Sequence, residues 1–133
     1  EYLSSALIDM KAHLADPASF DAARFEADEL ARIGMPSQVV MRHRLPHFTH
    51  LFAGEGYAAG YYAYLWADAL VADAAEAFAS APGGFFDEET ARRLREEILE
   101  VGDTRPPAES FRRFMGRDVD PGALMRDRGF AAE

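Results

Sequence analysis

The sequence of 133 residues predicts an all-α fold of about six helices. Apolar residues recur three and four positions apart along most of the chain, which is the spacing of one helix face. Proline, glycine and aspartate stand where these stretches begin or end. The one stretch with strand character is Val39-Val40-Met41, and because it lies between two prolines we interpret it as loop.

The first two helices are expected on either side of Asp16-Pro17, a pair that can end one helix and cap the next. The first helix runs from about Leu3 to Leu14, and its predicted buried stripe is Leu3, Leu7, Met10 and Leu14. The second ends near Ile33, because Gly34 offers a left-handed terminus, and its predicted apolar face is Phe20, Ala23, Ala27 and Leu30. An irregular loop follows as far as Pro46.

A long central helix is expected from Tyr57 to about Ala79, and it contains four of the five tyrosines and the only tryptophan. In this register Tyr57, Tyr61 and Tyr64 lie at positions i, i+4 and i+7, so their phenols share one face. Tyr62 and Trp66, which are also four apart, lie on roughly the opposite face. There we expect the two rings to pack into neighbouring helices.

The tyrosine face has two interpretations. An aromatic stripe at helical spacing is commonly part of a core. Tyrosine is a poor choice for three stacked core positions, however, because each buried hydroxyl without a partner costs about 1–3 kcal/mol. Gly54 and Gly56 precede the expected helix and would let backbone N–H groups approach a ligand closely. Glycine also begins helices that bind nothing, so both interpretations stay open at this point.

Three shorter helices are expected after the central one, each begun by Asp or Pro and ended by Gly. Their expected ranges are Asp87–Gly102, Pro106–Gly116 and Asp120–Gly129. The residues expected on their buried faces are all apolar: Ala91, Leu94, Ile98, Val101, Phe111 and Phe114.

The composition argues against several partners. The formal charge is −9, from 23 acidic and 14 basic side chains, whereas nucleic-acid binding needs a concentrated basic surface. No apolar run approaches the ~20 residues of a membrane span, so no membrane partner is expected. The absence of cysteine excludes a disulfide framework and suits the cytoplasm, which is the expected location. Because the chain begins at Glu1 without methionine and enters a helical pattern at once, we expect it to be a piece of a longer protein.

Three histidines, His43, His47 and His50, precede the central helix. Imidazole suits zinc, and the spacing of the three is helical. Pro46 lies inside this stretch, however, and would disrupt the turn that brings them together. We therefore expect no metal site within the chain, with His50 alone facing the ligand site and the other two histidines on the surface or in packing contacts.

The stretch from Gly56 to Trp66, Gly-Tyr-Ala-Ala-Gly-Tyr-Tyr-Ala-Tyr-Leu-Trp, follows His50 and a short glycine-containing loop. It closely resembles the C-terminal signature of the zinc oligopeptidases related to thimet oligopeptidase, oligopeptidase A and the peptidyl-dipeptidase Dcp. Four flanking segments are similar to the same family: Ser5–His13, Ile98–Gly102, Phe114–Asp118 and Leu124–Gly129. The resemblance therefore covers nearly the whole chain.

The resemblance implies that residues 1–133 are one segment, the C-terminal helical part of a larger, mostly helical zinc metallopeptidase catalytic domain. In that family a His-Glu-x-x-His helix and a downstream glutamate bind the zinc, and the motif lies upstream of the segment present here. This sequence contains no such motif. The segment alone should therefore be inactive, and its expected partners are a short peptide substrate and the remainder of the catalytic domain.

The resemblance also implies roles for individual residues. Hydrolysis of an amide passes through a tetrahedral intermediate whose oxyanion needs hydrogen-bond donors. Tyr64 and Tyr61 are the candidates for that contact, and His50 is the candidate for a hydrogen bond to the transition state or to the substrate backbone. Tyr57, with the backbone at Gly54 and Gly56, is expected to hold the substrate chain.

The loop before Tyr57 departs from the family pattern. Six residues separate His50 from Tyr57, where four or five are usual in the family, and the added position is Glu55 or its neighbour. This puts the reach of His50 in doubt but leaves the spacing of the tyrosines unchanged. Glu55 could contact a substrate amino group, although a solvated loop carboxylate is the simpler interpretation.

A second class of function is compatible with the composition. An acidic all-α chain with an exposed tyrosine face could be a stand-alone helical module that binds peptides or other proteins without catalysis. The presence of His-Glu-x-x-His upstream of Glu1 would distinguish the peptidase from this module. The sequence does not indicate whether a parent enzyme releases dipeptides or cuts internally.

Overall fold

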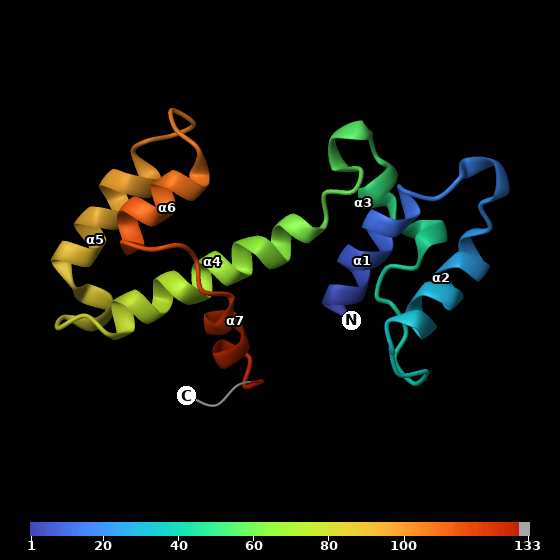
Figure 1. Ribbon diagram of the computed structural model, residues 1–133, viewed down its shortest axis with the longest axis horizontal. Helices are drawn as coiled ribbons and strands as arrows, with labels where there is room; N and C mark the ends of the chain where they lie inside the picture. The colour runs from blue at the N-terminus through green and yellow to red at the C-terminus, as the bar shows by residue number, and fades with distance from the viewer. Residues whose placement is uncertain (131–133) are drawn as a thin grey trace. The chain divides into compact units, whose positions relative to one another are not determined.

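The structure is a computed structural model that describes residues 1–130 (Figure 1). Within these residues the chain forms seven α-helices and no strand, which confirms the all-α prediction. The additional helix is α3 (Thr49–Phe52), a single turn inside a region predicted as loop. None of the helices in the described part of the chain is long and apolar enough to cross a membrane. The chain forms two compact units, residues 1–65 and 66–133, and the boundary falls within α4 (Tyr62–Ala79). The expectation of a single domain stays a prediction.

Unit 1 contains α1 (Tyr2–Ala12), α2 (Ala22–Arg32) and α3. Its fully buried apolar residues form one cluster: Ile8, Met41, Leu45, Phe48 and Leu51. Three of these five come from the irregular segment between α2 and α3, so this loop supplies much of the core. As predicted, Gly34 follows α2 with a positive φ of 73°, and no strand forms at Val39-Val40-Met41.

The predicted buried stripe of the first helix is wrong. Leu3 and Leu14 are 59% and 75% exposed, and the buried face of α1 is instead formed by Ser4, Ser5, Ala6, Ile8 and Asp9. Small side chains on this face let the backbone of α1 approach its neighbours closely. In α2 the packed residues are Ala22, Phe25 and Leu30, and Phe20 precedes the N-cap Asp21. Only Leu30 of the predicted face packs against the core.

Unit 2 contains most of α4, together with α5 (Glu88–Leu94), α6 (Pro107–Met115) and α7 (Pro121–Asp127). The predicted starts of its last three helices agree with the structure to within one residue, but the first of them, expected to reach Gly102, is helical only as far as Leu99. The Asp87 carboxylate accepts a hydrogen bond from the Thr90 N–H at 2.8 Å and caps α5, and Gly116 ends α6 with a φ of 77°. Phe111 and Phe114 are buried, as predicted.

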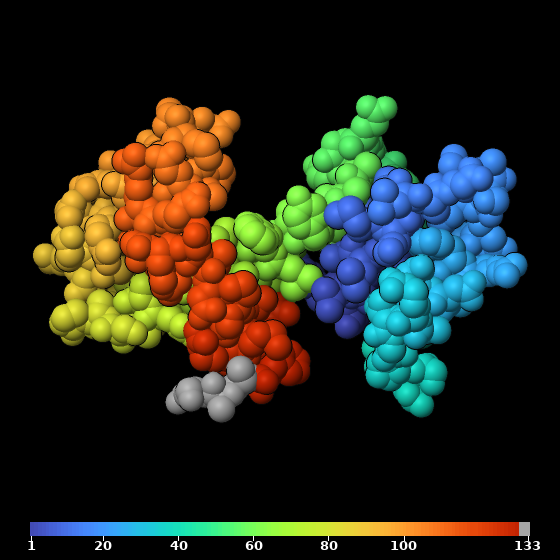
Figure 2. Space-filling view, in the orientation of Figure 1, coloured from blue at the N-terminus to red at the C-terminus, as the bar shows by residue number. Residues whose placement is uncertain are grey.

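The helix α5 continues into a π-helical turn, η5 (Arg95–Leu99), against which α6 packs (Figure 2). The residues expected on the buried face of this segment, Leu94, Ile98 and Val101, are only partly buried. They line an apolar pocket of about 370 Å³, together with Leu70 and other residues of α4 and α6. Ala91, the fourth residue of the predicted stripe, is exposed.

Buried and partly buried ion pairs join α4 to the C-terminal residues of unit 2. The Asp73 carboxylate, which is fully buried, accepts two hydrogen bonds from Arg117, at 2.6 and 2.7 Å, and one from the Asp120 N–H at 2.7 Å. Arg126 donates to both Glu76 and Asp120. The Arg117 guanidinium holds the pKa of Asp73 below its ordinary value of 3.8. Arg126 likewise lowers the pKa of Glu76 and of Asp120.

These lowered pKa values predict that unit 2 is destabilised by acid. A carboxylate whose pKa is lower in the folded state stabilises the fold above its unfolded pKa, and this contribution is lost as the pH falls through the folded pKa. The ordinary values are 3.8 for the aspartates and 4.5 for Glu76, so the melting temperature of the chain should be constant above about pH 5 and fall below about pH 4. Thermal unfolding can be followed by circular dichroism at pH values from about 2.5 to about 7. These curves give the melting temperature at each pH. A melting temperature that rises on acidification would contradict the prediction.

Candidate functional site

The central helix begins later than predicted. The structure places its first residue at Tyr62, not Tyr57, and its end at Ala79, as predicted. Glu55–Tyr57 form a separate 3-10 turn, η3, which is followed by Ala58 in an extended conformation and by Ala59 with a φ of 55°. The predicted helical register of Tyr57 with Tyr61 and Tyr64 is therefore wrong.

A carboxylate from α1 explains this late start. Asp9 is fully buried, and its Oδ1 and Oδ2 accept hydrogen bonds from the backbone N–H groups of Ala59 at 3.1 Å and Tyr61 at 2.8 Å. Two N–H groups that converge on one carboxylate cannot both follow the path of a continuous helix. The tertiary contact overrides the local helical pattern and turns the chain just before Tyr62.

The turn nevertheless brings the three predicted tyrosines together around His50. The ring centroid of His50 lies 4.7 Å from that of Tyr57, 5.8 Å from that of Tyr61 and 6.1 Å from that of Tyr64. The rings of Tyr61 and Tyr64 are 5.2 Å apart. We call these four residues the His50 cluster. All four belong to unit 1, so the loop of six residues leaves His50 within reach of Tyr57.

Three members of the His50 cluster, His50, Tyr61 and Tyr64, line a pocket of about 250 Å³, and the Tyr57 ring contacts His50 outside this lining. Its wall includes the buried ring of Phe48, which packs edge-on against Tyr61 at 5.1 Å. His43 and His47 also line this pocket, whereas we expected His50 alone to face the site. The turn η2 (Leu45–His47), which contains Pro46, brings His47 to the pocket without the continuous helix that the sequence spacing suggested.

The side chains of the His50 cluster differ in how far they are exposed. Tyr57 and Tyr64 are 53% and 47% exposed, whereas His50 and Tyr61 are only partly exposed, with Tyr61 packed against the core of unit 1. Within residues 1–130 no side chain of the His50 cluster makes a hydrogen bond through its ring nitrogens or phenol oxygen. These polar atoms are therefore able to bind a ligand without first breaking a contact in the described chain.

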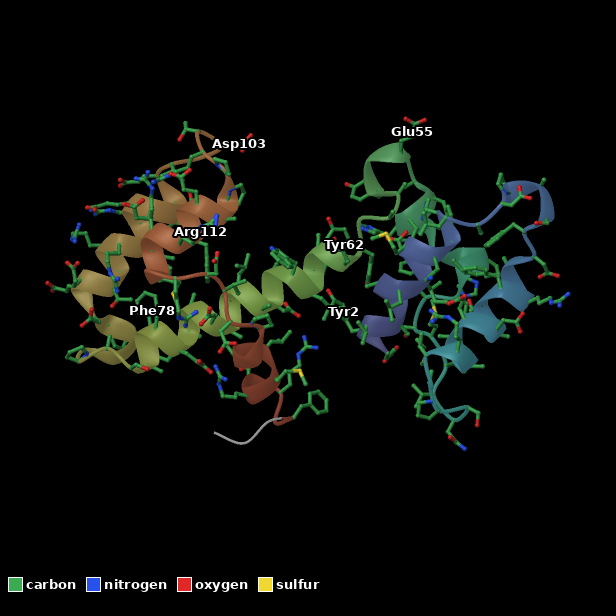
Figure 3. All side chains as sticks on the ribbon, viewed as in Figure 1. Tyr2, Glu55, Tyr62, Phe78, Asp103 and Arg112 are labelled. Carbon is green, nitrogen blue, oxygen red and sulfur yellow. The ribbon has the colours of Figure 1, made fainter. Side chains whose placement is uncertain are left out.

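The glycines and the acid of the preceding loop lie apart from this pocket. Gly54 and Gly56 are exposed, and a side chain at either position would meet nothing within 4 Å. The fold itself does not require glycine there, which leaves space for another chain beside the backbone. Figure 3 shows Glu55 at the outer tip of this loop, with its carboxylate directed away from the helices. This placement agrees with a solvated carboxylate.

The expectation that Tyr62 and Trp66 pack into neighbouring helices is wrong. Tyr62 is 51% exposed and Trp66 is 59% exposed in this chain. Both belong to the first turns of α4. Large rings that are left in water in this way are typical of a surface that contacts another protein or segment.

The described residues do not form a zinc site. No group of three His, Asp or Glu side chains within residues 1–130 is arranged to hold a metal ion, although three histidines line one pocket. The polar groups that line the pocket are imidazoles, phenols and the Thr49 hydroxyl.

Two buried carboxylates that position the pocket were missed by the sequence analysis. Asp9 fixes the turn before α4, and Glu26 of α2 accepts hydrogen bonds from the Arg44 side chain at 2.7 Å and the Leu45 N–H at 2.8 Å. Glu26 is 3% exposed and binds the first residue of η2, the turn that carries His47. The available signal was Asp9 itself, the one acid between apolar residues of the first helix. Tyr2 also lines the pocket and was not predicted there.

Comparison with known proteins shows which family this chain belongs to. The model of Peptidase family M3 matches residues 1–130. The chain is 48% identical over 87 residues to oligopeptidase A of Haemophilus influenzae, which covers 65% of this chain and 12% of that protein. It is 37% identical over 138 residues to the probable cytosolic oligopeptidase A of Arabidopsis thaliana, which covers 98% of this chain and 19% of that protein.

A third relative is the dipeptidyl carboxypeptidase of Escherichia coli, which is 35% identical over 132 residues. This match covers 97% of the chain and 19% of that protein. The chain therefore spans between 12% and 19% of the length of these three relatives. The matches confirm the resemblance seen in the tyrosine-rich stretch and its flanks, and this chain belongs to Peptidase family M3.

Proposed function

We propose that this chain is the substrate-binding and transition-state-stabilising part of a zinc metallopeptidase that hydrolyses short peptides. The observation that carries the proposal is the His50 cluster, whose ring nitrogens and phenol oxygens have no partner in the described chain, with His50, Tyr61 and Tyr64 lining one pocket. Relatives named oligopeptidase A and dipeptidyl carboxypeptidase support peptides as the substrate class. Short peptides suit a site of this size, and the remainder of the catalytic domain is the second partner.

The chemistry proposed for the cluster is hydrogen-bond donation to a developing oxyanion. When water attacks an amide carbonyl, negative charge gathers on the carbonyl oxygen, and donors fixed beforehand stabilise it without reorganisation. Tyr64 is the leading donor because its phenol is exposed at the pocket beside His50. Tyr61 is the second donor, with its ring held against Phe48. His50 donates either to the transition state or to the substrate backbone.

The same cluster would hold the substrate chain. The Tyr57 ring packs on His50 and is half exposed, so it can contact a peptide that enters the pocket. The open space beside Gly54 and Gly56 admits a second backbone at the edge of the loop. These contacts would position the scissile amide against the two phenols, and correct positioning is itself a large part of catalysis.

The zinc ligands of the proposed enzyme lie outside this segment. The family resemblance implies a His-Glu-x-x-His helix that this sequence lacks, and the described residues form no metal site. The segment alone is therefore proposed to be inactive. A cytoplasmic location is proposed with it, supported by the relative named probable cytosolic oligopeptidase A.

Peptide hydrolysis tests this proposal. The full-length protein and the 133-residue chain should each be assayed on peptides of about ten residues, with added zinc and with a chelator. We expect cleavage by the full-length protein that the chelator abolishes and zinc restores, and no cleavage by the chain alone. Chelator-resistant cleavage, or none by the zinc-loaded protein, would contradict the proposal. Peptide binding without cleavage in that protein would favour the stand-alone binding module.

A further inference from the structure

We infer that Asp9 is a positioning residue for the proposed site, acting through the turn at Ala59–Tyr61 and through His13. This inference rests on the proposed function for its catalytic consequence, while its structural part stands on the contacts of unit 1 alone. Within residues 1–130 the one hydrogen bond between the Asp9 side chain and the His50 cluster is the one from the Tyr61 backbone N–H. Asp9 therefore sets where the phenols lie and takes no part in the chemistry.

Three groups meet at the Asp9 carboxylate. Two are the backbone N–H groups of Ala59 and Tyr61, and the third is the His13 ring, whose Nδ1 lies 2.9 Å from both the Oδ1 and the backbone carbonyl oxygen of Asp9. The aspartate is 0% exposed, so these contacts, and not water, satisfy its side-chain oxygens. A buried carboxylate in such a setting is stable only when its lone pairs are occupied by donors. The contacts at this site are consequently interdependent.

The turn that Asp9 binds carries backbone strain. Ala59 has a φ of 55°, the left-handed region that an alanine rarely adopts, and it is the one non-glycine residue with a positive φ in the described chain. Backbone N–H groups that point at one anion stabilise such a conformation. Without the carboxylate the chain would relax toward helical or extended values at Ala59. The Tyr57 ring would then no longer be held against the His50 ring.

His13 extends the same arrangement to the element that carries His50. The ring of His13 stacks on the ring of Phe52, with centroids 5.7 Å apart and an interplanar angle of 25°. Phe52 is the last residue of α3, two positions after His50. Asp9 thus contacts the tyrosine side of the cluster through the turn and the His50 side through His13. One buried carboxylate fixes both halves of the site relative to α1.

The first arm of the test uses the chain itself and does not depend on catalysis. In Asp9→Asn the side-chain NH₂ group replaces one of the two carboxylate oxygens, so the N–H of either Ala59 or Tyr61 loses its acceptor. We expect the helical circular dichroism signal to be retained and the nuclear Overhauser effects between the His50 and Tyr57 rings to be lost. Asp73→Asn, at an equally buried aspartate of unit 2, is the matched control and should keep these effects.

A second variant separates the turn from general stability. Ala59→Gly places in the left-handed position a residue that adopts it readily, so by itself it should leave the ring contacts intact. Added to Asp9→Asn, it should restore part of the lost His50–Tyr57 signal, because less strain then opposes the turn. An Asp9→Asn chain that keeps every ring contact would overturn the inference. So would a chain that loses its helical signal and is not improved by Ala59→Gly, because Asp9 would then support the whole unit.

The second arm uses the full-length protein with zinc and a peptide substrate. Asp9→Asn should lower kcat by about ten- to hundred-fold with KM changed much less, because misplaced donors weaken the transition state more than the bound substrate. Ala59→Gly should recover part of the loss. An unchanged kcat in a variant that has lost the ring contacts would overturn the catalytic part. Absence of activity in the unsubstituted protein would instead count against the proposed function, and the first arm would still decide the positioning role.

Discussion

Replacing Tyr64 by phenylalanine in the full-length protein should lower kcat by about 10²–10³-fold and change KM little. The substitution keeps the ring that packs beside Tyr61 and His50 and removes only the phenol oxygen. A donor that acts on the oxyanion contributes in the transition state and not in the bound substrate, so its loss appears in kcat. Steady-state kinetics on one short peptide measure both constants.

Tyr62→Phe is the matched control for this prediction. Tyr62 lies in the same turn of α4 and is exposed to a similar extent, yet it makes no ring contact with the His50 cluster. Its replacement should leave kcat within about threefold, the size of effect expected at a surface position. A Tyr64→Phe protein with unchanged turnover would remove Tyr64 from the mechanism. Equal losses in both variants would point to the packing of α4 and not to a hydrogen bond.

Arg117→Ala should destabilise unit 2 by about 3 kcal/mol, the largest stability effect expected in the chain. It removes both guanidinium hydrogen bonds from Asp73 and leaves a fully buried carboxylate with one backbone donor. We place the effect at the lower end of the range for broken buried pairs because Arg117 itself is half exposed. Hydrogen exchange in α4 and α7 should accelerate accordingly, since the paired carboxylate joins these parts of unit 2.

Arg128→Ala provides the comparison. Arg128 also binds a carboxylate of α4, Asp68, but both partners are more than one third exposed. Its loss should change stability by less than about 1 kcal/mol, as is usual for surface ion pairs. If Arg117→Ala and Arg128→Ala lower the free energy of unfolding equally, the burial of Asp73 does not determine the strength of its ion pair with Arg117. The pH dependence described for unit 2 should also weaken in Arg117→Ala, because the pKa of Asp73 is then no longer lowered by the guanidinium.

Local signals predicted the boundaries of unit 2 well. Asp87 and Asp120 cap helices, Pro107 and Pro121 are the first residues of α6 and α7, and Gly116 ends α6 in the left-handed conformation. Each of these is decided by a few neighbouring residues, so the sequence alone is sufficient. The all-α class follows from the same signals.

Long-range contacts explain what the sequence could not predict. The start of α4 depends on Asp9, which lies about fifty residues earlier in the chain, as its bonds to Ala59 and Tyr61 show. No local pattern distinguishes Tyr57–Tyr61 from the first turn of a helix. The composition of the His50 cluster was nevertheless predicted, because the resemblance pointed to His50, Tyr57, Tyr61 and Tyr64 by their types and order. The geometry that brings them together is different from the helical face that we expected.

Exposed apolar residues account for the remaining errors. Leu3, Leu14 and Trp66 were expected in packing contacts and are all more than half exposed. In α1 the spacing marked a stripe that differs from the buried face, and within residues 1–130 these three side chains stay mostly exposed. A chain that spans 12% to 19% of its relatives' length leaves most of such a protein to supply the opposing surface, as the proposed function requires. Periodicity predicts which face is apolar and does not say which part of a protein covers it.

The proposed role of the His50 cluster is tested most directly by a crystal structure of the full-length protein with zinc and a bound peptide analogue. In this analogue a phosphinate replaces the scissile amide. The tetrahedral phosphinate oxygens occupy the positions of the oxyanion and the attacking water. We expect a phosphinate oxygen about 2.7–3.1 Å from the phenol oxygen of Tyr64 or Tyr61, with the peptide lying along His50 and Tyr57. A peptide bound away from the His50 cluster, with both phenols out of hydrogen-bonding range, would contradict it.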